Sequence, residues 1–268
     1  MDYVLLLLIG IAAATFGSLV GLGGGIFLVP TLIYLGPSIL DREFTASLAV
    51  GTSLFVLIFT ALSSTLTYMK QKKVDFRSGW LYFIASGPAA IVGSSLTGKI
   101  QQQSFQVVFG CFMMLMALIM VVREYMIPAQ IQWKIKREFT DETGKKWKYG
   151  YNVGVALLVG AAVGIISGLF GIGGGLLFVP VMVLLFAYPP HVATATSMFV
   201  IFLSAMLGSV MKIYLGEVDW LSVAALAPGA LIGGWLGARI AARLSGKRLL
   251  WLLRVTLFFF AVRMIWDY

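Results

Sequence analysis

Charged residues are scarce in this sequence of 268 residues: Asp, Glu, Lys and Arg make up 12% of it, about half the share that is typical of soluble domains. Hydrophobic residues make up 60%, and the mean hydropathy is +0.94. Most of them fall in long uninterrupted runs, which is typical of transmembrane helices rather than of one buried core. The composition excludes a water-soluble globular protein and predicts a multi-pass protein of the lipid bilayer.

Cysteine and histidine are almost missing, since Cys111 and His191 each occur once. A single cysteine excludes an internal disulfide framework and a thiolate metal cluster. No metal-ligand spacing, phosphate loop or nucleophile–base pair is present, so we expect neither an enzyme nor a bound metal or other cofactor. The start of the chain, Met1-Asp2-Tyr3, lacks the basic residues of a cleavable signal peptide.

The formal net charge of +9 does not indicate a nucleic-acid partner. The basic residues cluster between the apolar runs, which is typical of cytoplasmic loops of membrane proteins. The largest such cluster lies in the polar stretch 123–150. Its alternation of apolar and polar residues around a glycine-containing turn predicts a β-hairpin, in a basic insert at the cytoplasmic surface.

Eight apolar segments are long enough to be membrane spans. Two of them, 4–35 and 153–188, are too long for one helix and are interrupted by glycines. Six have the length of one crossing, about 20 residues at a rise of about 1.5 Å per residue. These six are 44–69, 80–96, 105–122, 192–215, 220–242 and 249–265.

The two glycine interruptions are near copies. Residues 21–30 read GLGGGIFLVP and residues 171–180 read GIGGGLLFVP, at an offset of 150. Downstream matches occur at an offset of 144, where Thr52-Ser53 corresponds to Thr196-Ser197 and Asp75 to Asp219. These copies predict two homologous transmembrane repeats, 1–122 and 151–268, on either side of the insert, a duplication that is common in transporters.

Each long segment is either one bent crossing or a helical hairpin that turns back at the glycines. Hairpins place 15 Lys and Arg on one side of the membrane and 4 on the other, whereas single crossings give 13 and 6. The positive-inside rule favours hairpins. The fold class we expect is therefore all-α and polytopic, with inverted repeats. Each repeat is a glycine-broken helical hairpin followed by three transmembrane helices, with the insert cytoplasmic and both termini outside.

Each helix break predicts a binding site for an anion. A break leaves backbone amides unpaired at the start of the second helical piece, where the helix dipole is positive. Glycines leave room for a ligand to approach these amides. The candidate residues are Gly23, Gly24, Gly25, Gly173, Gly174 and Gly175. The alternative is that these glycines only allow helices to pack closely.

Four hydroxyl groups follow the breaks at matching positions, on Thr52, Ser53, Thr196 and Ser197. They are candidate donors to a small oxyanion, and the alternative is hydrogen bonding to the carbonyl one turn earlier. His191 is a candidate for coupling, because its charge changes near neutral pH; the alternative is a role at the helix start. All carboxylates lie in loops or at span ends, which argues against a cation-binding site at mid-membrane.

At these motifs the sequence resembles the TauE/SafE family of sulfite exporters. The resemblance rests on residues 21–30, their copy at 171–180, and the downstream Ala-x-x-Thr-Ser patterns of Ala49–Ser53 and Ala193–Ser197. It covers the chain except for the insert 123–150. It implies a transporter of the prokaryotic cytoplasmic (inner) membrane that exports small sulfur-containing anions, such as sulfite, sulfoacetate and other organosulfonates.

The resulting hypothesis is a secondary transporter that holds a sulfur oxyanion or organosulfonate at the glycine breaks and works by alternating access. Two alternatives remain at the level of the sequence. One is a passive anion channel, and the other is a membrane assembly or scaffold protein whose glycine motifs only pack helices. The sequence does not distinguish among the sulfur anions, because backbone amides bind oxyanions of many kinds.

Overall fold

The computed structural model describes residues 2–40, 43–122, 133, 135–140, 146–245, 251, 255, 258 and 262. The first half contains five helices: α1 Asp2–Val20, α2 Gly25–Leu40, α3 Ala46–Lys70, α4 Phe76–Thr97 and α5 Gln102–Val122. The second half contains α6 Val153–Phe170, α7 Gly175–Leu184, α8 Pro190–Tyr214 and α9 Trp220–Arg243. Most of the expected span 249–265 lies outside the described residues.

Six of the described helices are long and apolar enough to cross a membrane: α1, α3, α4, α6, α8 and α9. Helices α2 and α7 are shorter and equally apolar, and each follows a glycine break. The fold is therefore mainly helical and that of a multi-pass membrane protein, as the composition predicts. Pro30 and Pro180 both lie inside the short helices rather than at their ends.

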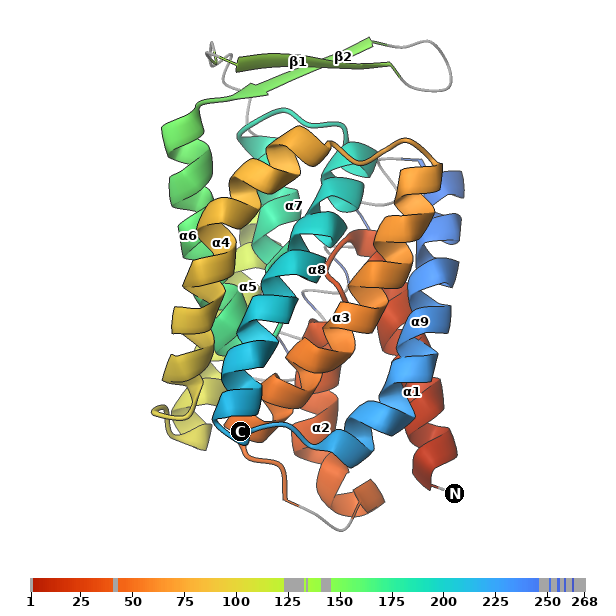
Figure 1. Cartoon of the computed structure of the whole chain (residues 1–268), viewed down its shortest axis with the longest axis vertical. Coiled ribbons are helices and arrows are strands. Elements are labelled where there is room, and N and C mark those ends of the chain that lie inside the picture. Colours follow the sequence, from red (N-terminus) through yellow and green to blue (C-terminus); the bar gives the residue numbers. More distant parts are fainter. Residues whose placement is uncertain are drawn as a thin grey trace.

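The described helices pack in pairs made from both halves of the chain (Figure 1). Helix α1 packs along α9, α4 packs along α6, and α3 packs against α8. Glycines allow these close contacts. A Cβ atom on Gly10 of α1 would lie 2.7 Å from the carbonyl oxygen of Leu226, and one on Gly160 of α6 would lie 2.8 Å from that of Tyr82. Such approach without side chains is typical of helix packing in membranes.

The two broken helices turn back toward opposite ends of the molecule (Figure 1). Helix α1 begins at the end that is far from the β-strands, and α2 returns to that end. Helix α6 begins directly beneath the strands, and α7 returns toward them. Both breaks consequently lie inside the bundle, where all their glycines are buried.

A β-hairpin lies across one end of the helices (Figure 1). Strands β1 Ile135–Thr140 and β2 Lys146–Tyr151 pair in antiparallel register, within and just beyond the polar stretch 123–150. The hairpin is fastened to the bundle, because the amide of Gly150 donates to the carbonyl of Phe186 at 3.1 Å. The ring of Trp133 also packs edge-on against Phe186 at a centroid distance of 5.3 Å.

Candidate functional site: the crossed glycine turns

Each broken helix ends where glycine adopts a left-handed backbone. The residues with positive φ are Gly21 (85°), Gly23 (81°) and Gly24 (95°) in the first turn, and Gly171 (70°), Gly173 (70°) and Gly174 (81°) in the second. Residues with a Cβ atom rarely adopt this conformation. Three left-handed glycines within four residues therefore explain why each helix stops and a new one starts so abruptly.

The two turns touch each other in the middle of the molecule. A Cβ atom on Gly25 would clash with the carbonyl oxygen of Gly171, and one on Gly175 would clash with the carbonyl oxygen of Gly21. The sequence places these turns 150 residues apart, and the fold brings their backbones into direct contact. The first residues of α2 and α7 therefore converge on one buried point.

The predicted serines bridge the two halves of the chain. The Ser53 hydroxyl on α3 donates to the carbonyl of Gly171 at 2.9 Å, and the Ser197 hydroxyl on α8 donates to the carbonyl of Gly21 at 3.0 Å. Ser197 also lies 2.8 Å from the carbonyl of Thr194 in its own helix. Ser53 therefore bonds to the glycine turn of the other half, whereas the single hydroxyl proton of Ser197 has two carbonyls within reach, one in that turn and one in its own helix.

The predicted threonines form a second pair of matching contacts. Thr52 accepts a hydrogen bond from the amide of Asp219 at 3.0 Å, and Thr196 accepts one from the amide of Asp75 at 3.0 Å. Each of these aspartates caps a helix, α9 and α4 respectively, as acidic residues at a helix start are expected to do. All four predicted hydroxyl residues are fully buried.

Backbone amides at both turns have no acceptor in the part of the chain that the structure describes. Within the described residues, no acceptor is in hydrogen-bonding position for the amides of Gly24, Gly25 and Ile26, nor for those of Gly174, Gly175 and Leu176. The first amides of any helix lack intrahelical partners, and at the surface water satisfies them. Here they belong to buried residues inside a bundle, where an unpaired amide is costly. An anion or a trapped water would satisfy them.

Sequence reasoning missed the hydroxyl of Thr194, although that residue lies within the Ala193–Ser197 pattern. Thr194 is fully buried, its hydroxyl has no hydrogen-bond partner among the described residues, and its backbone packs against Gly21. The corresponding residue of the first half is Val50, which packs against Gly171. A buried, unpartnered hydroxyl beside unpaired amides is a further donor for an anion.

A buried ion pair was also missed. Lys212 near the end of α8 donates to Glu217 at 2.7 Å and to Ser47 at 2.8 Å, and its side chain is fully buried. The sequence alone does not indicate this burial, since only the fold shows that α3 packs over Lys212.

Polar side chains also gather where the β-hairpin meets the bundle. The carboxylate of Asp75 accepts from the hydroxyls of Tyr149 at 3.0 Å and Ser78 at 2.5 Å, and Ser78 lies 3.1 Å from the hydroxyl of Tyr151. Burial, together with the charge of Asp75, raises the pKa of Tyr149 above its usual range. Tyr149 therefore remains a neutral donor that holds the hairpin on α4.

His191 lies in the first turn of α8 and is partly exposed. Thr196 and Ser197 follow more than one turn further along the same helix, so the histidine is set back from the glycine turns. Its use in coupling stays a prediction. No group of three or more metal-ligating side chains lies within the described ranges.

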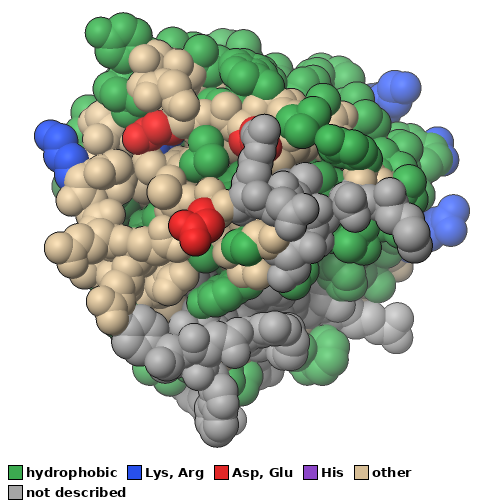
Figure 2. Space-filling model, turned by 90° about the horizontal axis from the view of Figure 1, so that it is seen from below, with side chains coloured by type: hydrophobic (Ala, Val, Ile, Leu, Met, Phe, Trp, Pro, Cys, Tyr) green, Lys and Arg blue, Asp and Glu red, His purple; other side chains and the backbone are tan. Residues whose placement is uncertain are grey.

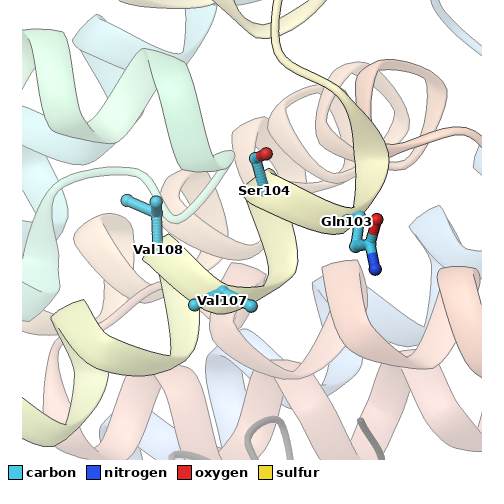
Figure 3. Close-up of a pocket in the computed structure, with 4 residues that line it drawn as sticks. All are labelled: Gln103, Ser104, Val107 and Val108. Atoms are coloured by element: carbon cyan, nitrogen blue, oxygen red, sulfur yellow. The ribbon is translucent and has the colours of Figure 1, made fainter.

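A surface hollow on α5 is separate from the predicted site. It is lined by Gln103, Ser104, Val107 and Val108, which are consecutive turns of one helix (Figure 3). Both valines are largely exposed, and none of the predicted binding residues lines this hollow. The hollow offers no charged group to an anion.

The crossed turns allow two interpretations. Clashes of a Cβ atom at Gly25 and Gly175 show that these two glycines are needed for close packing of the turns. Packing does not require unpaired amides or the unpartnered hydroxyl of Thr194, and these groups suit an oxyanion. The site therefore combines a packing role with a chemistry that fits an anion.

Comparison with known proteins places these motifs in context. The family model "Sulfite exporter TauE/SafE" matches residues 6–264. "Probable membrane transporter protein YunE" of Bacillus subtilis is 45% identical, across all of this chain and 98% of its own. "Probable membrane transporter protein MJ0441" of Methanocaldococcus jannaschii is 28% identical, across 91% and 88%. A "Probable membrane transporter protein" of Xylella fastidiosa is 26% identical, across 86% and 81%. No solved structure matches the chain.

Proposed function

Because this chain belongs to the TauE/SafE sulfite exporter family of membrane transporters, we propose that it is a secondary transporter that exports a small sulfur-containing anion. Sulfite, sulfoacetate and other organosulfonates are the candidate substrates. The observation that carries the proposal is the set of buried, unpaired amides at the start of α2 and α7. Two converging helix N-termini provide a positive field and donors for one oxyanion.

The substrate site that we propose consists of Gly23–Gly25, Gly173–Gly175 and the hydroxyl residues Thr52, Ser53, Thr196 and Ser197. In the present conformation, Ser53 and Ser197 are bonded to turn carbonyls rather than free. Binding of an anion would therefore accompany a shift of one half against the other, which exchanges these hydrogen bonds for bonds to the substrate. Thr194 joins this set, since no described residue bonds to its hydroxyl.

We further propose that the halves 1–122 and 151–268 are inverted repeats that rock against each other in alternating access. Paired contacts support this interpretation. The hydrogen bond from Ser53 to Gly171 has its counterpart in the bond from Ser197 to Gly21. Likewise, the packing of α1 on α9 has its counterpart in that of α6 on α4. The opposite directions of the two broken helices in Figure 1 also support it. The basic insert 123–150 is assigned to the cytoplasmic side of a prokaryotic inner membrane, and both termini to the outside.

Counterflow in proteoliposomes tests transport directly. We expect uptake of radiolabelled sulfite to saturate with concentration and to accelerate when the vesicles are preloaded with unlabelled sulfite, because a carrier returns faster when loaded. Uptake without saturation or acceleration would indicate a passive channel. Uptake no faster than in protein-free liposomes, repeated with sulfoacetate and thiosulfate, would favour a scaffold and contradict the proposal.

A further inference from the structure

Lys212, in the last turn of α8, is a cation whose side chain is fully buried among the helices. Among the Lys and Arg side chains that the structure describes, Lys212 is the one that is fully buried. Charged groups inside membrane proteins are costly, and where they occur they usually mark an ion or substrate pathway. The buried ammonium group of Lys212 is therefore a candidate binding site for an anion.

The hydrogen bonds of Lys212 leave part of the ammonium group unused. Its Nζ atom donates to the carboxylate of Glu217 at 2.7 Å and to the hydroxyl of Ser47 at 2.8 Å. A lysine ammonium has three donors, and the third has no acceptor in the described part of the chain. The Glu217 side chain is 24% exposed whereas that of Lys212 is 0% exposed. Glu217 thus lies between the buried cation and the outside.

This ion pair rests on the same stretch of α3 that carries the predicted site. A Cβ atom on Gly51 would clash with the carbonyl oxygen of Glu217 and lie 3.3 Å from the Cβ of Lys212. Gly51 directly precedes Thr52 and Ser53, and Ser53 bonds to the glycine turn. Acidic side chains are visible on this face, opposite the β-hairpin (Figure 2). The pair consequently lies between the face opposite the β-hairpin and the glycine turns.

The other half of the chain uses a neutral residue at the equivalent place. The offset of 144 aligns Lys212 with Tyr68, which is also buried and donates through its hydroxyl to the carbonyl of Ser18 at 2.9 Å. Packing at this helix end therefore does not require a charge. Replacing a buried ion pair by neutral groups is often neutral or stabilising, so stability alone does not account for Lys212.

We infer that Lys212 is a binding residue for a small oxyanion on the face opposite the β-hairpin, and that Glu217 is a resident carboxylate that the anion displaces. A carboxylate and a sulfur oxyanion offer the same oxygen acceptors to an ammonium group. The incoming anion replaces the Glu217 carboxylate and also accepts from the third N–H of Lys212. It then lies beside Ser47, on the helix that carries Thr52. This inference rests on the proposed function, since it assumes that the chain carries an anion.

Sulfite affinity of purified full-length protein, measured by thermal stabilisation and calorimetry, tests the inference through two substitutions with opposite effects. Glu217→Gln removes the competing charge, so we expect it to bind sulfite about tenfold more tightly. Lys212→Met removes the cation and should weaken binding about tenfold or more. Lys70→Met is the matched control, because Lys70 also lies in the last turn of a long helix but is exposed.

The double variant Lys212→Met/Glu217→Gln guards against misfolding, because it leaves no unpaired charge. We expect it to fold and to bind as weakly as Lys212→Met. If Glu217→Gln alters the melting temperature but binds sulfite no more tightly than the wild type, the ion pair only stabilises the fold and the inference is wrong. If the wild type itself binds no sulfur anion, the proposed function fails, which is a different result.

Discussion

Gly25 and Gly175 are the residues at which the two halves of the chain touch. Each contacts a carbonyl of the other half's glycine turn so closely that a Cβ atom would clash with it. Other glycines of the motif, such as Gly23 and Gly173, are needed for a second reason, namely positive φ. One motif therefore serves both backbone conformation and close approach, and substitution of its glycines would not isolate a binding role.

Gly25→Ala is predicted to destabilise the protein by roughly 3 kcal/mol or more, because the new methyl group meets a backbone carbonyl that has no room to move. Gly154→Ala is the control. That residue also lies at a helix start, and its added Cβ atom would meet nothing nearer than 3.7 Å. Thermal unfolding in detergent should therefore show a large loss for Gly25→Ala and little change for Gly154→Ala. Equal melting temperatures would show that the turns do not pack as described.

The sequence predicts some functional residues and not others, for a physical reason. Repetition identifies Ser53 and Ser197, because both copies carry them. It does not identify Thr194 or Lys212, since the first half has Val50 and Tyr68 at these positions. Their burial depends on helices distant in sequence, and a single sequence gives no information about which side chains those helices cover.

At the scale of elements, the positions of the helix breaks follow directly from local chemistry. Glycine runs stop α1 at Val20 and α6 at Phe170, and aspartates start α4 and α9. Alternation in the polar stretch similarly indicates β1 and β2. The pairing of α1 with α9 and of α4 with α6 did not follow from the sequence, because small residues occur in nearly every span.

The direction of the elements predicts a labelling pattern. Helices α3 and α9 both end at the face that carries the β-hairpin (Figure 1), so Lys73 and Ser245 should share one side of the membrane. Glu43 and Lys99 should lie on the other side. We expect cysteines at Lys73 and Ser245, in a Cys111→Ser background, to resist an impermeant maleimide in intact cells, whereas cysteines at Glu43 and Lys99 should react.

The alternative topology, in which each long apolar segment crosses the membrane once, predicts a different labelling pattern. It would place Lys73 and Ser245 on opposite sides, so that one of them reacts and the other does not. Cys111 is replaced so that each variant carries one cysteine, the introduced one.

On the scale of the whole molecule, two broken helices enter from opposite ends and meet at one buried point. The contacts around this point come in matching pairs, but the two faces of the molecule differ. The β-hairpin covers one face and bonds to Asp75 through Tyr149, while the opposite face carries Glu217 in front of Lys212. In a carrier that opens to the two sides in turn, different residues would therefore close each side.

The central claim is that the crossed turns bind a sulfur oxyanion, and the most direct measurement is thermal stabilisation of the purified protein by a panel of anions at matched ionic strength. The panel holds sulfite, thiosulfate, sulfoacetate, taurine, sulfate and chloride. A ligand at 100 times its Kd stabilises the folded state by about 2.7 kcal/mol. Thr194→Val, in α8, is compared with the wild type. Thr65→Val is the control, because the Thr65 hydroxyl is also buried and has no partner among the described residues, but it lies on another helix, α3.

We expect one or more of the sulfur anions to stabilise the wild type and Thr65→Val selectively. Thr194→Val should be at least as stable as the wild type without anion, since an unpartnered hydroxyl is removed, and should respond less to the same anion. Stabilisation of all three proteins to the same extent, or of none of them by any sulfur anion, would contradict an anion site at the glycine turns.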